Sequence, residues 1–166
     1  FRFREGFQSA VLRMAWAPDG SMVVGESNRG WNSLGSRSYG LEHLAWTGKV
    51  PMEIREMRAR PDGFELEFTR PVDPKSASNP GNFNLSSYTY MLHSRYGSEE
   101  VDAKKLKVGA ATVAPDGRTV RLRVDGLRAG YVHELTVEGL RSKDGQPLLH
   151  GMACYTLNQI PTGNPR

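Results

Sequence analysis

Three copies of the tripeptide Pro-Asp-Gly constrain the fold of this chain more than any other feature. They occupy residues 18–20, 61–63 and 115–117, and each stands between two apolar or alternating runs. Proline presets the first dihedral angle of a turn, the aspartate side chain bonds back to the backbone, and glycine accepts a positive φ. Each tripeptide therefore predicts a hairpin that joins two antiparallel strands.

The runs beside these turns have the composition and period of strands. After the third turn Val120, Leu122 and Val124 alternate with polar residues, which is the pattern of a strand with one solvated face. One helical turn is expected at 74–79, because Asp73 can cap the backbone amides that follow it. The expected strands are 11–16 with 21–26, 41–46, 52–59 with 64–69, 83–92, 106–108 with 120–124, 131–138 and 152–157.

These elements predict an all-β chain with an immunoglobulin-like β-sandwich of about seven strands at residues 51–158. Residues 1–50 hold a β-hairpin segment and a Gly/Ser loop, and residues 159–166 form a flexible tail. The 18 glycines and 10 prolines suit many short strands joined by tight turns. A chain of 166 residues is long enough for one such domain and a smaller segment.

Charge and cysteine content exclude several classes of function. The formal net charge is +4, and the cations are spread along the chain, so nucleic acid is not an expected partner. Cys154 is the single cysteine, which excludes an internal disulfide and a Cys-x-x-Cys metal site. No run approaches the roughly 18 apolar residues that span a bilayer. Because the sequence starts without Met or a signal-peptide pattern, we expect a piece of a longer protein.

Two parts of the chain resemble bacterial Ig-like (SbsA/Big-like) domains. The first is the stretch Pro-Val-Asp-Pro at 71–74, which lies between a strand and the Asn-Phe pair at 82–83. The second comprises Asp-Gly-Arg-Thr-Val-Arg-Leu at 116–122, the strand at 131–137 and Ser-Lys-Asp-Gly at 142–145. The resemblance covers about two-thirds of the chain. It implies a fold and says almost nothing about an activity.

The segment before Pro51 resembles a different family. Residues 13–26 are similar to a strand pair of a sorbosone or glucose dehydrogenase-type β-propeller. The resemblance covers fewer than fifty residues, so the chain holds one propeller blade at most. Together with the junction at 46–51, it implies the C-terminal end of a large secreted propeller protein. Some such proteins carry cytochrome c domains, but this chain has no Cys-x-x-Cys-His for haem attachment.

One hypothesis for a soft-metal site gathers four side chains, and a plainer interpretation stands beside it. Imidazole and sulfur ligands suit copper, and three of the four residues share parity on the last strand. A lone strand cysteine is, however, more often a small buried hydrophobe, and a histidine on a core face more often bonds a backbone carbonyl. The four residues are His133, His150, Met152 and Cys154.

An aromatic group offers a second candidate, a surface for protein docking or sugar stacking. Its members are Tyr88, Tyr90, His93, Arg95 and Tyr96. Aromatic rings combine a large contact area with a polar tip, and Tyr88 and Tyr90 fall on one strand face. The alternative is that alternate aromatic residues of a sandwich strand belong to the core. Exposure separates the two interpretations.

Charged residues form two weaker candidates. Arg121 and Arg123 share the solvated face of one strand and would suit an acidic partner, although such a stripe is usually only a wet face. Glu99, Glu100 and Asp102 lack the oxygen spacing of a calcium loop, so a surface turn is expected there. No nucleophile and base stand in a recognisable catalytic context.

We therefore predict a chain with no active site, metal or cofactor of its own. It would be a periplasmic or extracellular Ig-like module that docks or spaces a larger envelope assembly, with a protein partner or a missing upstream domain beside it. Contact with a membrane surface would then run through the partner. One alternative is the C-terminal accessory region of a quinone-dependent sugar dehydrogenase-like propeller enzyme, and another is a carbohydrate-binding module.

Overall fold

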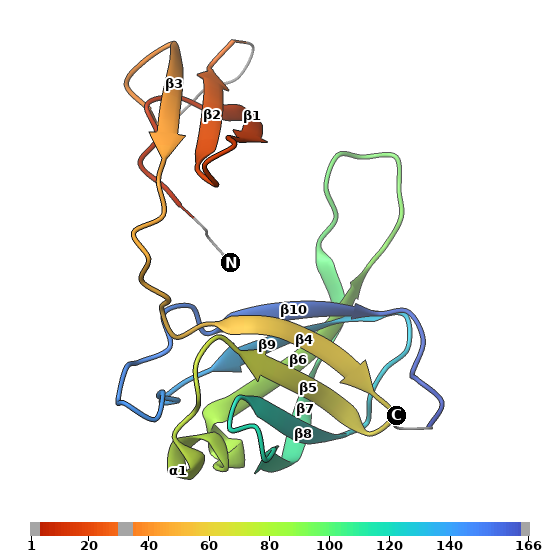
Figure 1. Ribbon diagram of the computed structural model, residues 1–166. Helices are drawn as coiled ribbons and strands as arrows, with labels where there is room; N and C mark the ends of the chain where they lie inside the picture. The colour runs from red at the N-terminus through yellow and green to blue at the C-terminus, as the bar shows by residue number, and fades with distance from the viewer. Residues whose placement is uncertain (1–3, 30–34, 164–166) are drawn as a thin grey trace. The chain divides into compact units, whose positions relative to one another are not determined.

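The computed structural model describes residues 4–29 and 35–163 and divides the chain into two compact units (Figure 1). One unit ends at Lys49 and the other begins at Val50. Both consist of antiparallel strands, so the predicted all-β class is confirmed. Parts of the expected Gly/Ser loop and of the expected tail lie outside the described residues. No described helix is long and apolar enough to cross a membrane.

The N-terminal unit is a three-stranded sheet in the order β1-β2-β3. Its strands are β1 (Val11–Trp16), β2 (Met22–Ser27) and β3 (Tyr39–Leu44). The first predicted hairpin is confirmed, because Trp16 pairs with Met22 across the turn. The segment before β1 is held to the sheet by two side chains: the Ser9 amide donates to Glu26 Oε2 at 2.7 Å, and the Gln8 amide donates to Glu42 Oε1 at 2.8 Å.

The C-terminal unit is a seven-stranded antiparallel sheet in the order β10-β9-β6-β7-β8-β5-β4. The second and third predicted hairpins are confirmed by the β4–β5 and β7–β8 pairs. The predicted strand at 106–108 is far longer than expected. The strands are β4 (Ile54–Arg60), β5 (Gly63–Phe68), β6 (Phe83–Tyr90), β7 (Glu100–Val113), β8 (Thr119–Asp125), β9 (Tyr131–Val137) and β10 (Met152–Leu157).

The long strand β7 turns this sheet into a sandwich. Its first half pairs with β6, and its second half pairs with β8 after an irregularity between Val108 and Ala110. The chain thereby forms one layer of β4, β5, β8 and the end of β7, and a second layer of β6, β9 and β10. In chain order this is the ABED and CFG arrangement of immunoglobulin domains. The predicted Ig-like sandwich is confirmed.

The two outer strands, β4 and β10, meet on the side opposite β7, so the sandwich is nearly closed like a barrel (Figure 1). The Leu149 amide donates to the Met52 carbonyl at 3.0 Å. The buried Glu53 carboxylate receives the His150 amide at 3.1 Å and lies 2.5 Å from His150 Nδ1. These contacts join the segments that lead into β4 and β10.

The core lies between the two layers and follows the strand period. Phe64, Leu66 and Phe68 of β5 and Val120 and Leu122 of β8 are all within 1% of complete burial. Leu135 on β9 and Leu157 on β10 close it from the opposite layer. At Gly63 a Cβ would lie 1.9 Å from the Leu122 carbonyl oxygen, so no larger residue fits where β5 begins to pair with β8.

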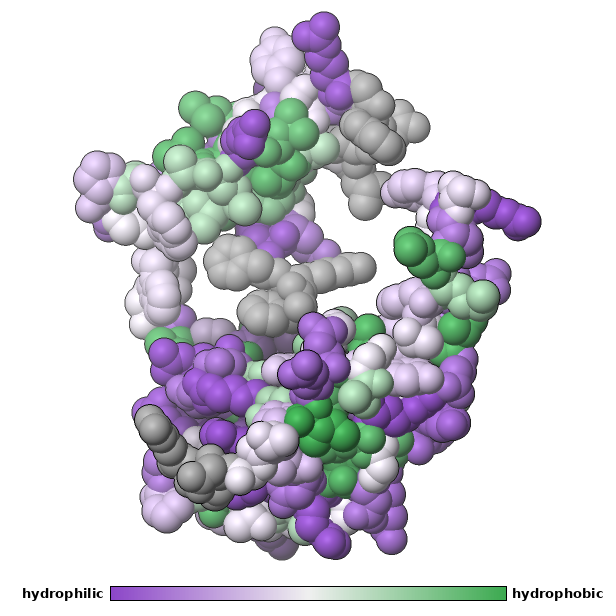
Figure 2. Space-filling model, turned by 90° about the vertical axis from the view of Figure 1, so that its right-hand side faces the viewer, coloured by the Kyte–Doolittle hydropathy of each residue, from purple (hydrophilic) through white to green (hydrophobic). Residues whose placement is uncertain are grey.

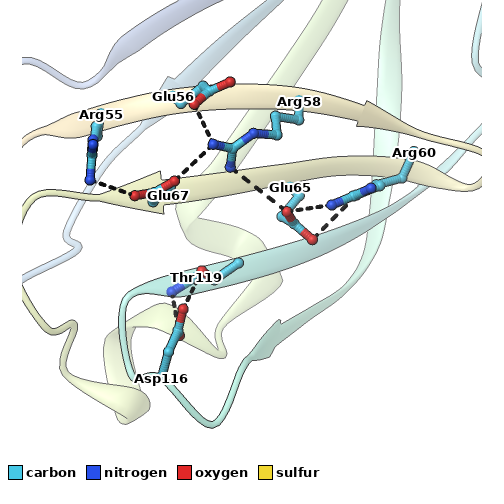
Figure 3. Close-up of polar contacts among 8 residues, drawn as sticks. All are labelled: Arg55, Glu56, Arg58, Arg60, Glu65, Glu67, Asp116 and Thr119. Atoms are coloured by element: carbon cyan, nitrogen blue, oxygen red, sulfur yellow. Dashed lines mark hydrogen bonds and ion pairs between the residues drawn. The ribbon is translucent and has the colours of Figure 1, made fainter. Parts of the chain in front are cut away.

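Short polar side chains fix the connections. Asp73 caps α1 (Pro74–Ala77) by accepting from the Ser76 amide at 2.9 Å, which confirms the predicted helical turn. Asp116, in the third turn, accepts from the Thr119 hydroxyl at 2.6 Å (Figure 3). These hydrogen bonds hold the pKa of both carboxyl groups below the usual value of 3.8.

The outward face of β4 and β5 is a ladder of opposite charges. Arg58 reaches Glu56 and Glu67, Arg60 binds Glu65 at 2.6 Å, and Arg55 binds Glu67 at 2.9 Å (Figure 3). Alternating signs across two strands cancel locally and keep this face solvated. The guanidinium and carboxylate groups of this ladder are therefore paired with one another and do not form a charged surface for a partner.

His133 is a fully buried polar side chain in the core of the sandwich. Its ring lies 5.3 Å from that of Phe64. Nδ1 donates to the Tyr131 carbonyl at 3.2 Å, and Nε2 accepts from the Arg128 amide at 3.4 Å. This pair of bonds requires the neutral imidazole, and burial lowers the pKa of His133 below its usual 6.5.

We predict a loss of stability in mild acid from this residue. In the unfolded chain His133 titrates near its usual pKa of 6.5, whereas in the folded chain its pKa is lower. Below about pH 6.5 the unfolded state therefore binds more protons than the folded state. The stabilising contribution of the neutral ring is complete above pH 6.5 and is lost as the pH falls from 6.5 through the pKa of the folded chain. Urea unfolding between about pH 8 and 5 will show this slope.

The H133Q variant keeps amide donors and acceptors but does not titrate, so its stability will change less over this pH range. The matched control is H93Q, which removes an exposed histidine outside the core of the sandwich. An unaltered slope in H133Q would contradict the assignment.

Candidate interaction surface

A hairpin arm projects from the sandwich where β6 runs into β7 (Figure 1). The arm comprises residues 89–101, and its last ladder pair joins Tyr90 to Glu100. Beyond that pair the Ser98 hydroxyl donates to the Met91 carbonyl at 3.1 Å, which ties the two sides of the loop together. The arm is therefore an extension of two core strands that ends in a nine-residue loop, residues 91–99.

The tip of the arm presents apolar side chains to solvent. Leu92 and Tyr96 are as exposed as in an extended peptide, at 103% and 105%. Met91 and Tyr90 are 65% and 49% exposed. Single exposed apolar residues are common on protein surfaces, but a contiguous group on a projecting loop is typical of a binding surface.

Arg128 clamps the base of the arm. Its guanidinium donates to the Ser87 hydroxyl at 3.1 Å on β6 and to the Asp102 carbonyl at 2.8 Å on β7, and it also pairs with the Asp102 carboxylate. The same group lies 3.6 Å from the centre of the Tyr131 ring, a cation–π contact. One side chain thus joins three strands at the point where the arm leaves the sheet.

Asp102 has an unusual backbone that the clamp accommodates. Its φ is +52°, in the left-handed region that aspartate tolerates better than most residues. Its carboxylate accepts from the Tyr131 hydroxyl at 2.8 Å. That hydrogen bond, followed by the charges of Arg128 and Lys104, lowers the pKa of Asp102, so the clamp stays ionised at neutral pH.

The structure divides the aromatic group that the sequence nominates. Tyr90, His93, Arg95 and Tyr96 all lie on the arm and are exposed. Tyr88 is instead buried against the sandwich, and its hydroxyl donates to Glu134 at 3.3 Å. Tyr88 and Tyr90 pack edge to face at 81°, so they form no flat platform for stacking a sugar ring.

Two apolar members of this surface, Met91 and Leu92, were missing from the sequence-based candidates. Met91 lines an open hollow of about 570 Å³ on the arm, and Leu92 is the next residue along the chain. The hollow is lined by Met91, Tyr96 and Val101 together with His93, Arg95 and Glu99. A run of apolar residues directly after a strand was the available signal, but in the sequence it reads as the end of that strand.

The four proposed soft-metal ligands do not come together. Tyr155 pairs with His133 in the sheet, and Cys154 pairs with Glu134, so Cys154 lies on the face opposite His133. His150 is engaged by Glu53 at the edge of the sandwich. Within the described residues no three His, Cys, Asp or Glu side chains gather as metal ligands. Burial, followed by the Glu134 carboxylate, raises the pKa of the Cys154 thiol, which disfavours the reactive thiolate.

The charged candidates also have structural partners. Arg121 pairs with Asp62 at 3.0 Å beside the second turn. Asp102 belongs to the Arg128 clamp and also lies 3.6 Å from Lys104. One member of the expected basic stripe and one member of the expected acidic group are thus engaged, in the sandwich and at the base of the arm respectively.

Comparison with known proteins bears on the fold. No protein-family model matches the chain, and no curated protein matches it. Solved structures of the bacterial S-layer protein SbsC are similar: its N-terminal part, the fragment rSbsC(31-844), and its domains 1–6. Each match is 22% identical, covers 66% of this chain and has a TM-score of 0.51.

The matched region spans 24% of the N-terminal part of SbsC and 14% of each of the other two structures. Identity this low shows a shared fold and nothing further. The chain therefore has the fold of a segment of these proteins.

We predict that weakening the clamp loosens the arm at its base. In R128K a single ammonium cannot reach Ser87 and both groups of Asp102 at once. The buried Ser87 then lacks a donor, which costs about 1–3 kcal/mol. Hydrogen exchange by mass spectrometry should show faster exchange in peptides that contain the ends of β6 and the start of β7.

The matched control is R55K, which alters the charge ladder on the outer face and should leave exchange at the arm unchanged. Equal exchange at the base of the arm in wild type and R128K would show that the clamp does not order it.

Proposed function

We propose that this chain is a non-catalytic structural module outside the cytoplasm, periplasmic or extracellular, which docks a protein partner within a cell-envelope assembly. The observation that carries the proposal is the arm, an ordered hairpin whose apolar tip is uncovered. The similarity to segments of an S-layer protein supports the same class of role, since S-layer proteins are structural proteins of the cell surface.

Burial of the arm tip supplies the favourable part of binding. Complete burial of a Leu or Met side chain contributes about 1.5–3 kcal/mol. Leu92, Met91 and Tyr96 are exposed enough to contribute together. Because the clamp at Arg128 already orders the base of the arm, less conformational entropy is lost when the partner binds.

The composition of the tip indicates the partner's chemistry. Between residues 90 and 98 the arm carries Arg95 and His93, and the carboxylates Glu99 and Glu100 follow directly, so the tip has charges of both signs around its apolar residues. We infer a protein cleft that is apolar at its centre and polar at its rim, which is the usual arrangement of a specific interface.

One observation favours a second candidate, the C-terminal accessory region of a quinone-dependent sugar dehydrogenase-like propeller protein. Among the described residues of the N-terminal unit, Val24 is the single buried apolar side chain. So small a core is expected of a sheet that packs on further sheets. The coding sequence upstream of Phe1 tests this candidate: several propeller blades there would support it, and no such blades would exclude it.

We predict that a photocrosslinking amino acid at position 92 or 96 forms one discrete adduct in the intact envelope of the source cells. The matched control is the same amino acid at Leu149, which is 61% exposed in the same unit but lies away from the arm sequence. With the crosslinking amino acid at position 92, the Y96D substitution should abolish the adduct, since a charge at the tip opposes burial.

Equal labelling from position 149 and the arm, or no discrete adduct from either arm position, would contradict docking through the arm. Mass spectrometry of the adduct identifies the partner and the residues that contact the tip.

A further inference from the structure

A buried acidic niche in the N-terminal unit carries an inference independent of the arm. Figure 2 shows hydrophobic side chains gathered on the surface of this unit, yet two of its polar side chains are almost wholly buried. Glu26 on β2 is 6% exposed, and Ser9, in the segment before β1, is 5% exposed. The unit therefore buries polar groups where a small sheet normally buries apolar ones.

The Glu26 carboxylate is only partly satisfied. Its Oε2 accepts from the Ser9 amide at 2.7 Å, which places the two side chains in one niche. Among the described residues, neither Glu26 Oε1 nor the Ser9 hydroxyl has a hydrogen-bond partner, although both atoms are buried. Buried polar atoms are nearly always paired, and a buried carboxylate without a counter-charge is costly. These two oxygen atoms therefore point to a ligand.

Glu42 on β3 brings a second carboxylate to the same niche. Because Glu26 pairs with Gly40, which is two residues from Glu42, the two glutamates are diagonal neighbours on one face of the sheet. Glu42 Oε1 accepts from the amide of Gln8 at 2.8 Å, and Gln8 directly precedes Ser9. Consecutive amides of one segment thus hold the two carboxylates side by side.

The charge of this pair is not neutralised within the described part of the chain. None of the ion pairs formed among the described residues includes Glu26 or Glu42. Gly40 lets the Glu26 carboxylate lie directly on the backbone of β3, since a Cβ there would be 2.9 Å from Oε2. Two neighbouring carboxylates repel each other unless a cation offsets their charge.

We propose that Glu26, Glu42 and Ser9 bind a calcium ion that links the segment before β1 to strands β2 and β3. The donor atoms are all oxygen, which hard cations prefer, and two carboxylates match the charge of a divalent ion. Magnesium usually keeps several of its waters, whereas Glu26 Oε1 and the Ser9 hydroxyl are closed to water. Calcium accepts irregular geometry, and Glu42 is half-buried, so water completes the coordination on that side.

Two-dimensional ¹H–¹⁵N NMR of the full chain, freed of metal with a chelator, measures binding at the niche itself. Calcium should shift the amide resonances of Gln8 and Ser9, which donate to the two carboxylates. The shift should saturate with a dissociation constant on the order of 0.1–1 mM, the range of extracellular calcium modules. Magnesium should bind at least about tenfold more weakly.

The E26Q variant keeps the size of the side chain and an acceptor for the Ser9 amide but removes the charge. Its affinity for calcium should fall by at least about tenfold, and S9A should cause a smaller loss. The matched control is E99Q, which removes an exposed carboxylate from the arm and should leave the constant unchanged. Dispersed resonances from β1 to β3 show that a variant retains its sheet, and E42Q replaces E26Q if that variant does not.

Three results would overturn the proposal. They are no saturable shift at Gln8 and Ser9 up to about 10 mM calcium, unchanged affinity in both E26Q and E42Q, and loss of binding in E99Q, which would place the ion on the arm. Docking of a partner by the arm can fail or hold separately, because the arm and the niche share no residue.

Discussion

Arg128 holds β6, β7 and the Tyr131 ring together at the point where two core strands leave the sandwich. The strand β7 belongs to both layers, so its course decides how the layers are joined and where the arm points. The left-handed backbone of Asp102 lies in this strand, and the guanidinium and Tyr131 satisfy its carboxylate. Without that contact, the start of β7 would lose its side-chain link to β6 at the base of the arm.

The exposed surfaces of the sandwich and of the arm differ in polarity. On β4 and β5 the exposed face is a ladder of Arg and Glu pairs that neutralise one another. At the arm tip Leu92 and Tyr96 have no neighbour that covers them. Exposed ion pairs add little stability but keep a face solvated. The contrast supports the proposal that the arm binds a partner and that the sandwich supports the arm.

Local turn chemistry made most of the fold predictable. The three Pro-Asp-Gly turns, the alternation in β8 and the Asp73 cap each act over a few residues, so the sequence alone identified them. The length of β7 escaped prediction because residues 100–105 are mostly polar and show no clean alternation. That stretch is a strand because β6 pairs with it, and such a tertiary cause is invisible in a local pattern.

The candidate sites depended on register, which the sequence did not reveal. His133 and Cys154 are separated because Tyr155, and not Cys154, pairs with His133. Tyr88 is buried while Tyr90 is exposed, since the pairing of β6 with β9 ends at Tyr88 and an irregularity in the pairing with β7 lies between Ser87 and Thr89. Met91 and Leu92 appeared to be strand residues until the structure placed them beyond the last ladder pair.

We propose that the arm tip is open in the isolated chain and covered in its native assembly. Hydroxyl-radical footprinting with mass spectrometry measures this directly at Met91, Leu92 and Tyr96, with Leu149 as the exposed reference. We predict rapid oxidation of the tip in the purified chain, strong protection in the intact envelope, and unchanged oxidation of Leu149. Equal oxidation of the tip in both samples would contradict it.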